Sequence, residues 1–168
     1  ANWSLGLPGA GQDLEIDGTC TLTADETNVY GTVLINATRT LALATFNLTH
    51  TGVFTNNGIL SIGASAGTGF TNGGMVINSG SVMTFTATAA QGKVVCNGNY
   101  FCNNSTIWTT NGRGSITFGV SGTCETINTL NRWSSITVPL GVATTCLTTC
   151  ALNDGGAAVT INGTLAIG

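Results

Sequence analysis

Hydrophobic and polar residues alternate along this chain in short runs separated by glycine and asparagine. The first run is 13–18, in which Leu14 and Ile16 occupy one face and three acidic residues the other. Such alternation indicates half-buried strands, and β-branched runs bounded by Gly and Asn favour strands joined by tight corners. A helical period persists nowhere, so almost no helix is expected. Further strands are predicted at 19–23, 31–36, 40–44, 81–88, 93–96, 115–118, 135–138 and 158–162.

A short unit recurs between Thr40 and Gly80. Residues 51–63 read TGVFTNNGILSIG and residues 68–80 read TGFTNGGMVINSG, two variants of a Gly-aromatic-Thr-Asn corner followed by a β-branched run. A unit this short cannot enclose a core and must bury its apolar face against neighbouring copies. The pattern therefore predicts a β-solenoid.

A longer period is indicated by Cys102, Cys124 and Cys146, which lie 22 residues apart. Divided at this period from Leu14, the chain gives about seven coils with strands about 4.8 Å apart. We predict an all-β fold with one solenoid domain over 13–168 and an N-terminal arm or cap over 1–12. The alternative is a β-sandwich or jelly-roll subunit completed by strand donation, which the short repeat disfavours.

The two ends of the predicted solenoid share a template, LEIDGT at 14–19 and VTINGT at 159–164. A solenoid leaves unpaired strand edges at its ends, and a helix or a charged cap usually covers them. The sequence shows no helical cap after the last strand. We expect end-to-end assembly contacts, made by arm donation or by direct stacking, at Leu14, Ile16, Leu165 and Ile167.

The composition of the chain excludes some classes of binding partner and indicates a cellular location. Four Lys and Arg residues in 168 exclude the basic footprint that nucleic acid or an anionic membrane requires, whereas a net charge of −3 permits self-association. No run of eighteen apolar residues is present, so no membrane insertion is expected. The chain begins at Ala1, as after removal of a signal peptide, which predicts an extracellular or cell-surface location.

The cysteines and the N-glycosylation motifs of the chain are typical of a secreted protein. Six cysteines predict disulfides in an oxidising compartment. One arrangement pairs Cys96 with Cys102 and Cys146 with Cys150, leaving Cys20 and Cys124; another stacks Cys102, Cys124 and Cys146 in one column. Spacing does not choose between them. Candidate N-glycosylation sites are Asn2, Asn36, Asn47, Asn103, Asn104 and Asn162.

The chain lacks a recognisable catalytic set. Residues 63–67 match G-x-S-x-G, but no helix can start after them and the only histidine, His50, precedes the serine. His50 is expected to be an exposed corner residue. Asp13, Glu15 and Asp17 are the only carboxylate cluster and the only candidate metal ligands, here for calcium; otherwise they form a solvated strand edge. We predict a protein that is not an enzyme and uses no cofactor.

Two ligand-binding alternatives come from surface residues. Rows of threonine are typical of ice-binding solenoids, but the threonine pairs in this sequence do not hold one register. Aromatic residues that could bind glycans are scattered, so core or corner packing is expected for them. The threonines are Thr21, Thr23, Thr84, Thr86, Thr88, Thr109 and Thr110, and the aromatic residues are Trp3, Tyr30, Tyr100, Trp108 and Trp133.

The segments TGVFTNNGILSIG, SGSVMTFTATA and SSITVPLGVATTCLTTCALNDGGAAVTINGTLAIG resemble the Gly/Asn/Thr-rich repeats of large secreted surface proteins of bacteria and archaea, of adhesin or haemagglutinin-like type. The resemblance covers about 13–168 and implies a right-handed parallel β-helix, secretion and a structural or adhesive role. The short chain and its six cysteines depart from that family and favour a filament subunit. We therefore expect a secreted structural protein that polymerises head to tail with copies of itself and carries N-linked glycans. The alternative is a monomeric ice-binding or glycan-binding, adhesive solenoid.

Overall fold

The computed structural model describes residues 8–63, 69–86, 92–103, 106–108, 114–127, 130–131, 133–147 and 158–167. These residues form short strands and no helix, and every strand pairing among them is parallel. The prediction of an all-β parallel solenoid is confirmed. Residues 1–7 of the predicted arm lie outside the described residues, and 8–12 contain no strand.

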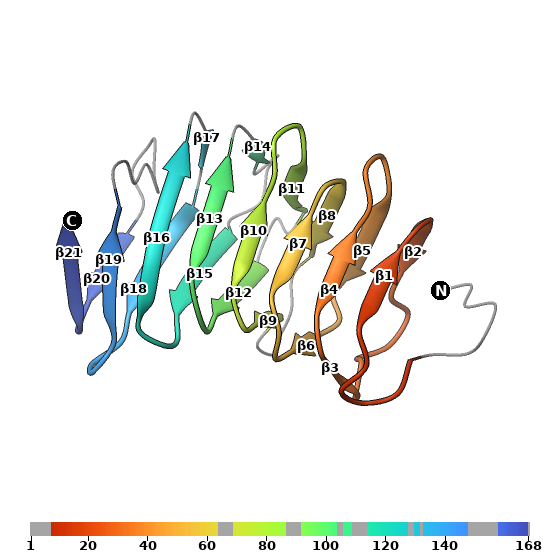
Figure 1. Ribbon diagram of the computed structural model, residues 1–168, viewed down its shortest axis with the longest axis horizontal. Coiled ribbons are helices and arrows are strands. Elements are labelled where there is room, and N and C mark those ends of the chain that lie inside the picture. Colours follow the sequence, from red (N-terminus) through yellow and green to blue (C-terminus); the bar gives the residue numbers. More distant parts are fainter. Residues whose placement is uncertain are drawn as a thin grey trace.

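Three sheets run along the long axis of the molecule, and from β1 to β18 the described chain visits them in the order A, B, C on each coil (Figure 1). Sheet A contains β1 (Leu14–Ile16), β4 (Val33–Ile35), β7 (Phe54–Asn56), β10 (Met75–Ile77), β13 (Tyr100–Asn103), β16 (Gly122–Ile127), β19 (Ala143–Cys146) and β21 (Thr164–Ile167). Sheet B contains β2 (Thr19–Thr21), β5 (Thr40–Ala44), β8 (Ile59–Ile62), β11 (Val82–Phe85), β14 (Thr106–Trp108) and β17 (Leu130–Asn131). Sheet C contains β3 (Val29–Tyr30), β6 (Leu48–His50), β9 (Phe70–Asn72), β12 (Gly92–Cys96), β15 (Gly114–Phe118), β18 (Trp133–Val138) and β20 (Ala158–Ile161).

Coil number and coil length both differ from the prediction. Sheet B has six strands in the described part of the chain, so complete three-stranded coils are fewer than the seven expected. Successive register partners in sheet A show that a coil takes 19 residues from Leu14 to Val33 and 25 from Met75 to Tyr100. The 22-residue period is thus an average, because the corners between strands differ in length.

The short repeat at 51–63 and 68–80 is not a coil. Phe54 of the first unit lies in β7 on sheet A, and Phe70 of the second lies in β9 on sheet C of the same coil. Their rings meet edge to face across the interior, with centroids 4.7 Å apart. The two units are therefore two sides of one coil that share a corner design.

Buried asparagines organise those two corners. The side-chain oxygens of Asn56 and Asn72 accept hydrogen bonds from the backbone amides of Gly58 and Gly74, at 3.0 and 3.2 Å. An asparagine that accepts a hydrogen bond from the backbone amide two residues ahead closes a turn locally and satisfies that backbone amide. Both asparagines are fully buried, so the polar corner is part of the core.

The core is a stack of inward residues, one or two from each strand. Aliphatic, aromatic and cysteine side chains alternate with outward ones, as in β1 and β15. Tyr30, Tyr100 and Trp133 are buried, which confirms core packing for three of the predicted aromatic residues. Trp3 and the side chain of Trp108 lie outside the described residues.

Candidate functional site

Within the described part of the chain, the two ends of sheet A are edge strands. β1 and β21 lie at opposite ends of the long axis, and each has one neighbour within the sheet (Figure 1). Leu14 donates to the Thr32 carbonyl at 2.9 Å, and Asn36 donates to the Ile16 carbonyl at 3.1 Å. Because a parallel strand directs alternate residues to opposite sides, the amide and carbonyl of Glu15 face the open side. They are available to a further strand.

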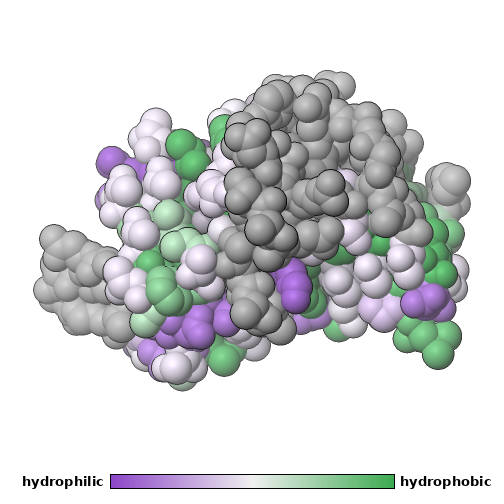
Figure 2. Space-filling view, turned by 180° about the vertical axis from the view of Figure 1, so that it is seen from behind, coloured by the Kyte–Doolittle hydropathy of each residue, from purple (hydrophilic) through white to green (hydrophobic). Residues whose placement is uncertain are grey.

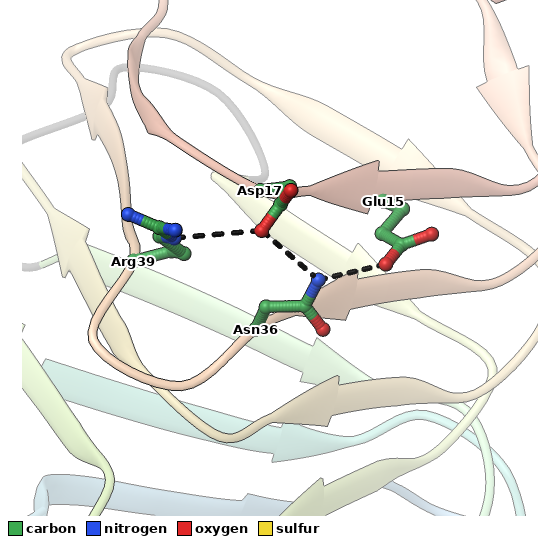
Figure 3. A network of polar contacts seen from close by, with 4 residues as sticks. All are labelled: Glu15, Asp17, Asn36 and Arg39. Carbon is green, nitrogen blue, oxygen red and sulfur yellow. Dashed lines mark hydrogen bonds and ion pairs between the residues drawn. The ribbon is translucent and has the colours of Figure 1, made fainter.

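Acidic side chains flank this first edge, and the next coil holds them (Figure 3). Glu15 and Asp17 accept hydrogen bonds from the side-chain amide of Asn36, at 2.7 and 3.5 Å. Arg39 forms an ion pair with Asp17 across 3.4 Å. The amide of Thr32 donates to Asp13 at 2.7 Å, and this bond lowers the pKa of the Asp13 carboxyl.

These carboxylates do not converge on a common point. Among the described residues no group of three or more His, Cys, Asp or Glu side chains is placed to hold a metal ion. Asp13 bonds Thr32, whereas Glu15 and Asp17 share Asn36. The arrangement is that of a charged edge strand, which discourages unwanted strand pairing.

The predicted assembly residues divide between interior and surface. Leu14 and Ile16 are 4% and 2% exposed, so the first coil buries them. Leu165 is 38% exposed, and the side chain of Ile167 lies outside the description. Ile161, which the sequence reasoning missed, is 44% exposed. Its register partner Val138 is buried, so Ile161 occupies an interior position that no described strand covers on its outer side.

His50 is buried, so its prediction as an exposed corner residue is wrong. Alternation along β6 turns Leu48 and His50 inward, where the imidazole packs against Phe54 and Phe70 with centroids 6.1 and 5.3 Å away. Its Nδ1 lies 3.1 Å from the Gly52 carbonyl oxygen. Burial lowers the pKa of His50 to about 4, so the ring is neutral at pH 7.

The cysteines do not form the predicted column of three. Cys124 and Cys146 are register partners, but Cys102 pairs with Thr126 because the coil from Tyr100 to Cys124 is longer than 22 residues. No disulfide joins any two of the five cysteines in the described part of the chain.

In the other predicted arrangement, the pair of Cys96 and Cys102 is not joined by a disulfide. Cys20 lies in β2 of the first coil, whereas Cys124 lies in β16, the sixth strand of sheet A. Five strand spacings, about 24 Å, therefore separate the coil of Cys124 from the first coil. That distance rules out a bond between them. Burial raises the pKa of Cys96 to about 11, and its thiol lies 3.5 Å from the Gly98 carbonyl oxygen. Cys150 lies outside the described residues.

The candidate glycosylation sites differ in accessibility. Asn162 is exposed at a corner. Asn36 is bonded to the acidic edge, and Asn47 bridges coils by accepting from Gly69 at 2.8 Å and donating to Asp25 at 3.1 Å. Asn103 is half-buried. Asn2, Asn104 and the serine motif beyond Gly63 lie outside the described residues.

The outer face of sheet C carries a regular array that the sequence reasoning missed. One outward residue from each strand is β-branched, and these residues are successive register partners. Their spacing in the chain varies with coil length, which hides the array from a fixed-period search. We call it the outer column; its members are Val29, Thr49, Thr71, Val95, Thr117, Thr137 and Thr160.

The threonines considered from sequence do not form such an array. In sheet B, Ala42 and Ser61 separate Thr21 from Thr84 in the register. Residues Thr88, Thr109 and Thr110 lie outside the described part.

No described helix has the length and apolarity to cross a membrane. Comparison with protein-family models, curated protein sequences and solved structures finds no match to this chain.

Proposed function

We propose that this protein is a secreted structural subunit that assembles head to tail with copies of itself into an extracellular filament or surface fibre. The observation that carries the proposal is the exposure of Ile161 and Leu165 on β20 and β21. Both occupy interior positions whose partners in the preceding coil, Val138 and Thr144, are buried. A following coil would cover them, and we assign that role to the first coil of a second copy.

Backbone chemistry supports the direction of assembly. The open side of β1 offers the amide and carbonyl of Glu15, and β21 offers the complementary groups of a parallel strand. Adding a strand to an open sheet edge supplies main-chain hydrogen bonds without new side-chain chemistry. The contact joins two different surfaces, so it propagates into a fibre unless the rotation closes a ring.

Charge supports the same direction. Contact between two first coils would bring the acidic side chains of Asp13, Glu15 and Asp17 against their own copies, and like charges directly opposite one another are destabilising. The strands β20 and β21 contain no charged residue. Head-to-tail contact therefore avoids the repulsion that head-to-head contact would meet.

The extracellular setting is also part of the proposal. The likeness to adhesin-type repeats supports a surface location, and exposed Asn162 is the described sequon best placed to carry a glycan. The low charge of the chain adds little repulsion between copies. No enzymatic activity is proposed.

Electron microscopy of the purified protein over a concentration series tests this function. We expect uniform filaments from the natural sequence and their loss in Leu165→Asp, because a buried carboxylate at the junction would be unpaired. The matched control is Leu140→Asp: Leu140 is already 86% exposed at the turn between β18 and β19, so a carboxylate there stays solvated and should leave filaments intact.

Two further outcomes decide the details. Filaments that vanish on removal of residues 2–12 assign the junction to arm donation, whereas filaments that persist assign it to direct coil stacking. Single particles at every concentration would overturn the proposal, as would equal loss of filaments in Leu140→Asp.

A further inference from the structure

We propose that the outer column of sheet C is an ice-binding surface. Five of its seven members carry hydroxyls: Thr49, Thr71, Thr117, Thr137 and Thr160. None of these hydroxyls makes a hydrogen bond within the described part of the chain, and the side chains are half-buried or exposed. They are free to bond ordered water.

The side chains of the outer column repeat at a regular distance. Its members are register partners in parallel strands, so consecutive side chains repeat at the strand spacing of about 4.8 Å. A ligand that fits such a line must repeat as well. Ice is a periodic lattice of donors and acceptors, whereas a small solute would engage one or two positions and leave the rest unused.

The column is also rigid and uniform in shape. Threonine and valine have the same branched outline, and two heavy substituents on Cβ restrict χ1. Val29 and Val95 therefore continue the ridge of methyl groups where a hydroxyl is missing. Little rotamer freedom remains to be lost on binding, which favours many weak and identical contacts.

Strand propensity alone does not account for the array. The corresponding outward column of sheet A contains one threonine among six register partners: Glu15, Leu34, Thr55, Val76, Phe101 and Glu125. The side chains of that column are also half-buried or exposed and face the same demand for strand formers, yet only Thr55 and Val76 among them are β-branched. Uniform β-branched residues are a property of the sheet C face.

Ice fits this face better than a glycan does. No described outward residue of sheet C is aromatic, and aromatic rings are the usual platform for sugars. The flanking outward positions include Ser115 and Ser135, and Lys93 is the charged exception. In the view opposite sheet A, the described residues are mostly pale and weakly polar, with scattered purple and green ones (Figure 2).

The proposal stands independently of the filament. The column runs along the solenoid axis, so neither end of the molecule is needed to form it, and end-to-end stacking would leave it exposed. Ice binding can therefore fail while filaments form, and the reverse also holds.

Thermal hysteresis and inhibition of ice recrystallisation test the proposal. The natural protein should show both, rising with concentration. Thr117→Lys and Thr137→Lys should each reduce hysteresis severalfold because the longer side chain lifts the face off a flat lattice. The matched control is Thr55→Lys, an outward threonine of sheet A, which should retain full activity. Circular dichroism establishes that each variant is folded.

A second pair of variants separates shape from hydrogen bonding. Thr137→Val keeps the outline and removes the hydroxyl, so it should retain more activity than Thr137→Lys. The proposal is overturned if the natural protein shows neither effect on ice, if Thr55→Lys loses as much as Thr137→Lys, or if the protein binds insoluble cellulose or chitin without affecting ice.

Discussion

Single residues in this protein show how enclosure by other coils changes side-chain chemistry. His50 and Cys96 are the last residues of β6 and β12, and both side chains are buried. Burial disfavours the charged form of each, which lowers the pKa of the imidazole and raises that of the thiol. Neither is then suited to acid–base or nucleophilic work at neutral pH.

His50 should make stability depend on pH in mildly acidic solution. Its folded pKa of about 4 lies below the ordinary value of 6.5, so the unfolded chain binds the proton more readily. Stability is complete above pH 6.5 and falls as pH drops toward 4, by up to about 3 kcal/mol. We expect denaturant unfolding at pH 7, 5 and 4 to show this loss, and His50→Leu to remove most of it.

Asp13 also makes stability depend on pH, because its pKa is lowered from the ordinary value of 3.8 in the folded protein. That effect falls below pH 3.8, outside the range from pH 6.5 to 4 in which His50 titrates. Equal pH dependence in His50→Leu and the natural sequence between pH 6.5 and 4 would contradict the assignment.

Cys96 should be inert in the folded protein. A thiol with a pKa of about 11 that is also buried presents little thiolate to an alkylating reagent at pH 8. We expect mass spectrometry to find Cys96 unmodified by iodoacetamide in the native state and fully modified after denaturation without reductant. Failure to react after denaturation would mean that the sulfur is oxidised.

At the scale of the element, the corners set the coil length and hence the register. Strands of two to six residues are joined by turns in which an asparagine side chain bonds a nearby backbone amide and glycine lets successive coils approach. A Cβ added to Gly73 would lie 1.8 Å from the Thr51 carbonyl oxygen, which belongs to the corresponding corner of the preceding coil. No side chain fits there.

Gly73→Ala should therefore destabilise the fold by more than about 2 kcal/mol, because the backbone must shift to relieve the clash. Gly18→Ala is the matched control, since nothing lies within 4 Å of a Cβ at Gly18. Thermal unfolding followed by circular dichroism measures both. A melting temperature for Gly73→Ala equal to that of the control would show that the corner adapts without cost.

At the scale of the molecule, three parallel sheets share one axis and differ in what they present to solvent. Sheet A mixes charged, aliphatic and aromatic residues, whereas sheet C presents the outer column. The ends differ as well, with acidic side chains at β1 and uncovered apolar positions at β20 and β21. The difference between the two ends underlies the proposed assembly, and the difference between the sheets underlies the proposed ice-binding face.

Much of the fold could be predicted because strand alternation is a local signal. Leu14 and Ile16 face inward and Glu15 outward, as the period of two requires, and the same holds for Met83, Thr84 and Phe85. The predicted number of coils, by contrast, was derived from the 22-residue spacing of three cysteines in the sequence. The period misled because Cys102 is displaced by two positions from its expected partner.

The candidate site could be predicted only in part. The apolar strand that contains Leu165 was visible in the sequence, but the burial of His50 was not, since its neighbours Phe54 and Phe70 come from other strands. The outer column was missed for the same reason. Its members recur at uneven intervals, and only the pairing of strands aligns them.

Side-chain alternation and corner residues act over a few positions, so the amino-acid sequence is enough to predict short strands around a repeating core. Which residues are neighbours on successive coils depends on the folded chain, because corners of different length shift each strand by a few residues against the last. Whether a side chain points inward or outward depends on its own strand, whereas the register between strands depends on the lengths of all the corners in a coil. Features confined to one strand were therefore visible in the sequence, and those that cross strands, namely the cysteine pairing, the environment of His50 and the outer column, were not.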